Sequence, residues 1–205
     1  QLMKTKFKGL KFENEWLASL GKPQLTGSWL IWGPSANGKT RFALQLAKYL
    51  TNFGVRVAYD SLEEGASLSM RNAFQQCEMH EAAGKIVLLD KEPVLDLVTR
   101  LKMRKSPDVV IIDSIQYTGM NYNAYKSLID GFRNKLFIFI SHADGRLPEG
   151  RVAKSIRYDA FVKIWVEGYT AYPVSRFGGG EPYLIWPEKA DLFINQNTNK
   201  NENTD

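Results

Sequence analysis

The sequence predicts an α/β fold with a mainly parallel, doubly wound sheet and antiparallel edge strands near the C-terminus. Three observations lead to this prediction. Short apolar segments alternate with helical segments between residues 28 and 140, as in parallel sheets covered on both faces. A glycine-rich pattern stands between the first of these strands and the helix that follows it. After Ser141, strand-like segments follow one another through tight glycine-containing joints, which indicates antiparallel pairing.

The predicted parallel strands are near-continuous runs of β-branched and aromatic residues at 28–32, 55–59, 86–89, 109–112 and 137–140. Helices are predicted at 40–53, 66–80, 94–105 and 124–134, and antiparallel strands at 160–166, 170–175 and 182–186. The helix at 40–53 has apolar residues at three- and four-residue spacing, and Gly54 ends it. A short helix is also expected at 13–20, with Gly21 and Pro23 as its stop.

The chain is expected to divide into three regions. Residues 1–27 form an N-terminal arm and short helix, 28–190 the core, and 191–205 an Asn-rich tail without stable structure. The arm carries Lys4, Lys6, Lys8 and Lys11. These lysines are interpreted as a solvated face, with phosphate binding as the alternative.

Composition excludes several classes of protein. Of 205 residues, 44% are hydrophobic and 24% charged, and no apolar run approaches the roughly 18 residues that span a bilayer. No membrane partner or secretory leader is therefore expected. The single cysteine, Cys77, forms no internal disulfide, which fits a reducing, cytoplasmic location and excludes a zinc ribbon. The net charge of +5 is compatible with a polyanionic partner.

The pattern G-x-x-x-x-G-K-[ST] is matched in full. Its residues are Gly33, Pro34, Ser35, Ala36, Asn37, Gly38, Lys39 and Thr40. The glycines permit turns that aim successive backbone N–H groups at an anion, and the following helix adds its positive N-terminal end. Lys39 is expected to reach the β- and γ-phosphates, and the Thr40 hydroxyl to ligate Mg²⁺. The stretch predicts a nucleotide site, with ATP and Mg²⁺ as ligands.

Carboxylates are expected beside this loop. The strand at 109–112 delivers Asp113 to the carboxyl edge of the sheet, where it completes the Mg²⁺ site. The strand at 55–59 leads to Glu63 and Glu64, of which Glu63 is the first candidate for the general base. Ser114, directly after Asp113, cannot serve as a base. We expect Gly33–Thr40, Glu63 and Asp113 on three adjacent strand tips.

This placement of the base resembles the RecA-like ATPases, including bacterial RadA and the DnaB-type replicative helicases. The similar segments are Asp113–Gln116 (D-S-I-Q), Phe137–His142, Gly150–Val152 with Asp159, and Ser175–Gly178, and together the resemblance covers roughly residues 15 to 188. The chain departs from RadA at Val174, where RadA has a lysine. RadA's zinc module and protease-like domain have no counterpart, so a stand-alone core is expected.

The resemblance implies further roles. His142 would sense the γ-phosphate, and Arg176 would act as an arginine finger on a neighbouring subunit's nucleotide in a ring or filament. A structural histidine and a surface ion pair are the alternatives. Single-stranded DNA would contact loops at Tyr117–Asn123 and Ala143–Tyr158. The second loop carries Arg146, Arg151, Lys154 and Arg157.

The predicted function is therefore an oligomeric, Mg²⁺-dependent ATPase acting on single-stranded DNA in recombination, repair or replication. Two alternatives stay open. A small-molecule phosphotransferase would need an acceptor pocket and an arginine-rich lid. A nucleotide-switched loader or adaptor would bind ATP with little turnover and recruit a partner protein.

Overall fold

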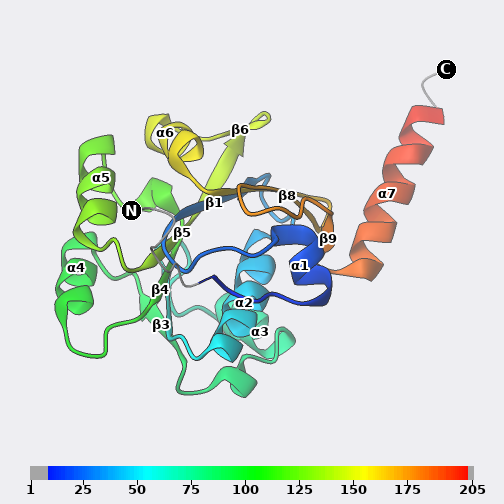
Figure 1. Ribbon diagram of the computed structural model, residues 1–205. Helices are drawn as coiled ribbons and strands as arrows, with labels where there is room; N and C mark the ends of the chain where they lie inside the picture. The colour runs from blue at the N-terminus through cyan, green and yellow to red at the C-terminus, as the bar shows by residue number, and fades with distance from the viewer. Residues whose placement is uncertain (1–8, 203–205) are drawn as a thin grey trace.

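The computed structural model describes residues 9–202, with side chains described up to residue 195. A nine-stranded sheet forms its centre (Figure 1). The strands are β1 (Gly27–Gly33), β2 (Val57–Ser61), β3 (Ile86–Asp90), β4 (Val109–Asp113), β5 (Leu136–Asp144), β6 (Leu147–Pro148), β7 (Val162–Glu167), β8 (Thr170–Ser175) and β9 (Tyr183–Leu184). The helices are α1 (Asn14–Leu20), α2 (Lys39–Leu50), α3 (Leu68–Gln76), α4 (Val94–Lys102), α5 (Tyr122–Gly131), α6 (Arg151–Asp159) and α7 (Pro187–Glu202). Short 3₁₀ turns are η2 (Thr51–Phe53), η3 (Met79–Ala82) and η4 (Ile115–Tyr117).

The strand order is β3-β2-β4-β5-β1-β7-β8-β9, and β6 pairs only with β5. All pairs from β3 to β7 are parallel, whereas β8 and β9 add in antiparallel fashion. The predicted fold class is confirmed, with one refinement: β7, expected to be antiparallel, pairs in parallel with β1. The expectation of three adjacent strand tips is wrong, because β5 lies between β1 and β4.

Helices cover both faces of the sheet. Helices α1, α2 and α3 pack on one apolar cluster, while α4, α5 and α6 pack on another. Side chains alternate along β1 between the two clusters, with Trp29 and Ile31 in the first and Leu30 and Trp32 in the second. Burial on both faces explains why the central strands read as near-continuous apolar runs.

The N-terminal helix is part of this packing. Trp16 of α1 stacks on Tyr49 and Tyr183, with ring centres 5.0 and 4.3 Å apart. Gly21 ends the helix with φ of +72°, and a side chain there would meet the carbonyl of Phe177. The short helix and its glycine stop are therefore as expected. Through Trp16, helix α1 packs against α2 and β9. Of the four lysines assigned to the arm, Lys4, Lys6 and Lys8 lie outside the described residues.

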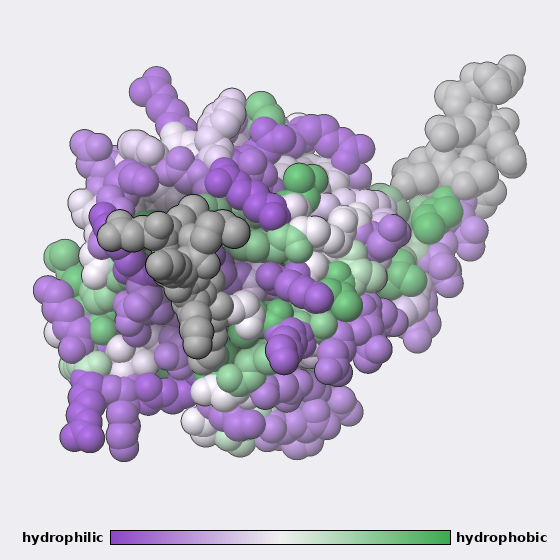
Figure 2. All heavy atoms as spheres, viewed as in Figure 1, coloured by the Kyte–Doolittle hydropathy of each residue, from purple (hydrophilic) through white to green (hydrophobic). Residues whose placement is uncertain are grey.

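Two segments differ from expectation. Residues 143–158, expected as a loop, contain β6 and most of α6, which starts after Gly150 at φ of +83°. Helix α7 runs to Glu202 and so enters the Asn-rich stretch that was expected to lack structure. The division into arm, core and tail stays a prediction. Within residues 9–202, no helix has the length and apolar character needed to cross a bilayer, and the surface in Figure 2 is mainly hydrophilic with small apolar groups.

Candidate active site

The glycine-rich loop connects the end of β1 to the start of α2. At Gly33 a side chain would collide with the carbonyl oxygen of Val166 on β7, so only glycine fits there. Gly38 caps α2 with φ of +101°, a conformation that favours glycine, and its carbonyl accepts a hydrogen bond from Phe42 N–H at 2.9 Å. The loop therefore combines a close backbone approach with a positive helix end, the arrangement that binds anions.

Lys39 lies across this loop. Its Nζ donates hydrogen bonds to the carbonyls of Gly33 and Pro34, at 2.9 and 2.7 Å. Burial lowers the pKa of Lys39, while the negative charges of Asp113 and Glu63 act in the opposite direction. The Lys39 ammonium is thus near enough to the carboxylates of Asp113 and Glu63 for their charges to affect its pKa.

The loop is tied to the β7–β8 turn through Asn37. Its Oδ1 accepts a hydrogen bond from the N–H of Gly168 at 2.7 Å, and its carbonyl accepts one from Tyr169 N–H at 3.1 Å. Its Nδ2 donates to the Ser35 carbonyl within the loop at 2.8 Å. These bonds fix the loop conformation against the turn that follows β7, the strand next to β1.

Asp113 occupies the tip of β4 and is almost fully buried. Its Oδ2 accepts hydrogen bonds from the Tyr59 hydroxyl at 2.6 Å and from Thr40 Oγ1 at 3.3 Å. Burial raises the pKa of Asp113, and the Tyr59 hydrogen bond opposes this shift. Thr40 and Asp113 offer a hydroxyl and a carboxylate oxygen, the hard donors that Mg²⁺ prefers alongside phosphate oxygens. The donor set therefore fits the predicted Mg²⁺.

Glu63 follows β2 and is held against β4. The N–H groups of Leu62 and Glu63 donate to the Asp113 carbonyl, at 2.7 and 3.1 Å. Glu63 Oε2 lies 2.8 Å from His142 Nε2, while Nδ1 of the same ring lies 3.4 Å from Glu149 Oε2. His142 thus stands between two carboxylates and fixes the direction of the Glu63 side chain.

The position of His142 is itself supported by a glutamine. Gln116 donates from Nε2 to Ser141 Oγ at 2.8 Å and to the Glu149 carbonyl at 3.0 Å. The N–H of Glu149 in turn donates to the His142 carbonyl at 2.9 Å. The tip of β5 is therefore joined to η4 and to the segment before α6.

These groups surround one cavity of about 280 Å³. The lining residues are Ser35, Ala36, Gly38, Lys39, Thr40, Arg41, Glu63, Glu64, Asp113, His142 and Tyr169. The structure thus brings together five residues of the glycine-rich loop with both candidate bases, His142 and Asp113, the carboxylate predicted to hold Mg²⁺. Gly33, Pro34 and Asn37 lie in the loop without lining this cavity.

Arg176 lies apart from this cavity. It follows β8, its N–H donates to the Phe161 carbonyl at 3.0 Å, and its guanidinium sits 5.2 Å from the centre of the Phe161 ring. The guanidinium of Arg176 also contributes to lowering the pKa of Lys163, after burial as the larger cause. Among the described residues, no contact is recorded between Arg176 and the glycine-rich loop of the same chain.

Two of the four basic residues predicted to bind nucleic acid place their guanidinium groups over tryptophan rings. The guanidinium of Arg146 lies 5.1 Å from the centre of the Trp165 ring, and that of Arg157 lies 5.4 Å from the Trp32 ring. Arg146 also donates from Nη1 to Glu167 Oε2 at 2.9 Å. Both arginines are therefore engaged within the fold.

The other two proposed cations are on α6. Lys154 Nζ lies 3.5 Å from Asp144 Oδ2. Arg151 is exposed at the first turn of the helix. Residues 143–158 were expected to be a loop, and that expectation is wrong, because they contain a hairpin and most of helix α6.

Sequence reasoning missed three residues of the site. Tyr59 looked like one more apolar strand residue, and nothing in the strand pattern marks its hydroxyl. Gln116 was noted only within its D-S-I-Q segment, without a role. Glu149 fell in the supposed loop. None of the three lines the cavity, and only the pairing of distant strands shows that they contact Asp113, the tip of β5 and His142.

Comparisons with known proteins show similarity in structure alone. No family model matches the chain, and no curated protein matches its sequence significantly. A KaiC-like protein from the hyperthermophilic archaeon Pyrococcus horikoshii OT3 matches with a TM-score of 0.61 and 18% identity, covering 87% of this chain and 94% of that one. The flagellar accessory protein FlaH from Methanocaldococcus jannaschii matches with a TM-score of 0.64 and 16% identity, over 87% and 97%. The chain has the fold of the RecA-like P-loop ATPases.

Proposed function

We propose that the protein binds ATP with Mg²⁺ and hydrolyses it in the cavity between the glycine-rich loop and the tips of β2, β4 and β5. The observation that carries this proposal is the convergence of Lys39, Thr40, Asp113 and Glu63 on one cavity of about 280 Å³. The four side chains come from three separate elements, and each has the chemistry that phosphoryl transfer to water needs.

The loop and its two polar residues hold the phosphates. Backbone N–H groups around Gly38 and the start of α2 face the anion, and Lys39 adds an ammonium. Thr40 and Asp113 would hold Mg²⁺, which neutralises phosphate charge when bound. Tyr59 keeps the Asp113 carboxylate directed toward Thr40 through its 2.6 Å hydrogen bond.

Glu63 is the proposed general base. Its carboxylate lies at the cavity wall, where it accepts the proton of the attacking water. His142 orients Glu63 through the 2.8 Å contact, and a γ-phosphate entering the cavity would compete for the same imidazole N–H. This competition is the physical basis for the sensor role proposed for His142.

We extend the proposal to an oligomer and a DNA partner. Arg176 lies on the β8 side of the sheet and away from its own cavity, as a finger serving a neighbouring subunit would. The surplus of positive charge, 27 Lys and Arg against 22 Asp and Glu, supports a single-stranded DNA partner.

The test is steady-state hydrolysis of ATP with and without single-stranded DNA, over a range of protein concentrations. Glu63→Gln should bind a fluorescent ATP analogue as the wild type does, yet hydrolyse ATP at least about 100-fold more slowly. Glu64→Gln is the matched control, because Glu64 lines the same cavity but lacks the imidazole contact. Lys39→Ala should abolish nucleotide binding or turnover.

Unimpaired hydrolysis by Glu63→Gln would reassign the base. Stimulation of the wild type by DNA supports the DNA partner, and a steep rise in specific activity with protein concentration supports Arg176 acting between subunits. ADP release that depends on a small acceptor and ignores DNA would indicate a phosphotransferase instead. Slow turnover with nucleotide-dependent capture of a protein would indicate a switch.

A further inference from the structure

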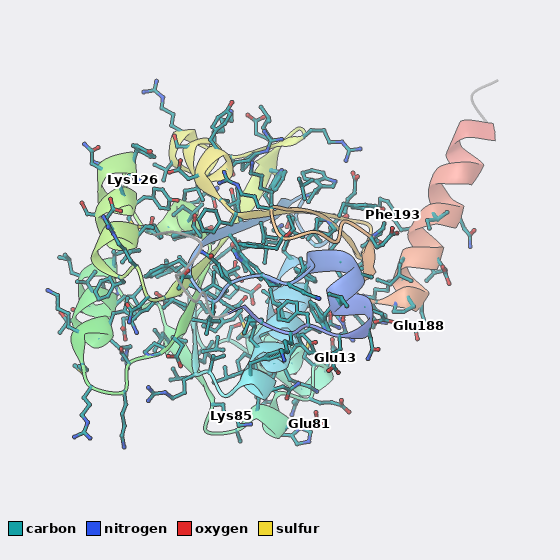
Figure 3. The ribbon with its side chains drawn as sticks, in the orientation of Figure 1. Glu13, Glu81, Lys85, Lys126, Glu188 and Phe193 are labelled. Atoms are coloured by element: carbon teal, nitrogen blue, oxygen red, sulfur yellow. The ribbon has the colours of Figure 1, made fainter. Side chains whose placement is uncertain are left out.

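A second concave surface lies at the opposite end of the strands. It is a groove of about 310 Å³ between the starts of β2 and β3 and the end of α4. We call it the basic groove; its lining residues are Arg56, Val57, Gly84, Lys85, Ile86, Val87, Arg100, Met103, Arg104, Lys105, Ser106 and Pro107. Five of these twelve residues are Arg or Lys, and none is Asp or Glu. Lys85 marks this end of the molecule at the lower edge of Figure 3.

The charge of the groove is only partly neutralised by neighbouring acids. Arg100 forms a two-point ion pair with Glu92, at 2.7 and 2.6 Å. Asp108 Oδ2 accepts a hydrogen bond from the backbone N–H of Arg56 at 2.9 Å. Among the described residues, no ion pair is recorded for Lys85, Arg104 or Lys105, which are all exposed. Three cations on the two walls of one groove therefore have no recorded ion-pair partner among the described residues.

The wall formed by residues 103–107 is held in place from within. The buried Lys135 donates from Nζ to Ser106 Oγ at 2.8 Å and to the Pro107 carbonyl at 2.6 Å. Arg56 donates from Nη2 to the Ser106 carbonyl at 3.0 Å. These bonds fix the wall, with Lys135 buried behind it and Arg56 among the residues that line the groove. Residues 97–107 contain no acidic side chain, so the positive potential is not broken along the wall.

We propose that the basic groove binds the phosphate backbone of a single-stranded nucleic acid. This inference rests on the proposed DNA partner and assigns it a surface away from the ATP cavity. The ligand must be polyanionic, because three free cations face it without an acid among the lining residues. The groove is concave, which suits a strand rather than a flat bilayer surface. Val87 and Met103 are 43% and 60% exposed beside the cations and offer apolar contact to sugars and bases.

The segment 143–158, which the sequence predicts to contact DNA, is a weaker candidate. Arg146 and Arg157 rest on tryptophans, and Lys154 lies beside Asp144. Binding phosphate through these three side chains requires breaking contacts already made within the fold, which leaves the exposed Arg151 as the fourth predicted cation. At the basic groove Lys85 and Arg104 can meet phosphate without such a loss.

The experiment measures the affinity of the full chain for a fluorescent oligo(dT) by anisotropy, from 50 to 300 mM salt. The test variant is Lys85→Gln/Arg104→Gln, which removes one charge from each wall at exposed positions. The matched control is Arg151→Gln/Lys154→Gln on α6, which removes the same charge. Binding of a fluorescent ATP analogue is measured on all three proteins, and it reports folding and the ATP site independently of DNA.

The groove variant should bind the oligonucleotide about 20-fold more weakly at 0.1 M salt. Its plot of log affinity against log salt should lose about 1.4 in slope, since each phosphate contact contributes about 0.7. The control should bind like the wild type. The proposal is overturned if the α6 variant loses affinity and the groove variant does not. It is also overturned if the wild type binds the ATP analogue but no oligonucleotide. The same holds if the wild type binds anionic vesicles or an acidic peptide and no oligonucleotide. Neither result contradicts the proposed ATP site, because binding of the ATP analogue is measured separately.

Discussion

Asp60 provides a sharp test of the electrostatics of this fold. Its side chain lies on β2, with only 1% of the residue exposed, on the face covered by α4. Burial raises its pKa to about 7, against 3.8 for a free carboxyl, and the hydrogen bond from Glu92 N–H at 3.1 Å partly opposes that rise. Since the folded state holds the proton more tightly than the unfolded state, Asp60 stabilises the fold at low pH and this contribution is lost as the pH rises through 7.

The size of the effect follows from the two pKa values. Between pH 5 and 7 the unfolded carboxyl is ionised and the folded one protonated, so the free energy of unfolding falls by about 1.36 kcal/mol per pH unit. From pH 5 to 8 the wild type should therefore lose about 2.5 kcal/mol through this residue. Asp60→Asn keeps the acceptor for the Glu92 N–H and cannot ionise, so the variant should not show this loss.

The assay is urea unfolding of both proteins at pH 5 and pH 8. Comparing the two pH values cancels any constant cost of the substitution and any titration shared by both proteins. Asp96→Asn, at an exposed carboxylate on α4, is the control and should follow the wild type. If the wild type and Asp60→Asn change in parallel between pH 5 and 8, Asp60 ionises normally and the argument from burial is refuted.

Three further predictions concern packing and positioning. Gly33→Ala should lower the free energy of unfolding by about 2 kcal/mol or more, because a methyl group there meets the Val166 carbonyl; an unchanged urea midpoint would contradict this. Tyr59→Phe should cost about 1–2 kcal/mol of stability and weaken Mg²⁺-dependent binding of an ATP analogue, since Asp113 loses its 2.6 Å hydrogen bond. Lost stability with an unchanged Mg²⁺ titration would limit Tyr59 to a structural role. Trp16→Ala should cost about 3 kcal/mol in thermal unfolding, because α1 loses its two stacking contacts; a fully retained melting temperature would show that α1 does not support the core.

Much of the fold could be predicted because its signals are local. Each parallel strand is buried on both faces, so its own residues are apolar, and each was placed to within a few residues of where it lies. Helix α6 was missed because it begins at Arg151, directly after a short hairpin and Gly150, and this stretch resembles a charged loop. The parallel pairing of β7 was missed because tight glycine joints on its C-terminal side suggested antiparallel neighbours throughout.

The candidate site divides in the same way. The stretch from Gly33 to Thr40 can be identified from the amino-acid sequence, because the turn, the ammonium and the hydroxyl are neighbours along the chain and their geometry follows from backbone torsions. Three other features become visible only in the folded chain: Tyr59 contacts Asp113, His142 lies between Glu63 and Glu149, and three cations that are unpaired among the described residues line one groove. Those contacts join residues that are distant in sequence, and they depend on which strands become neighbours in the sheet. That choice is set by the packing of both faces together, which no single segment contains.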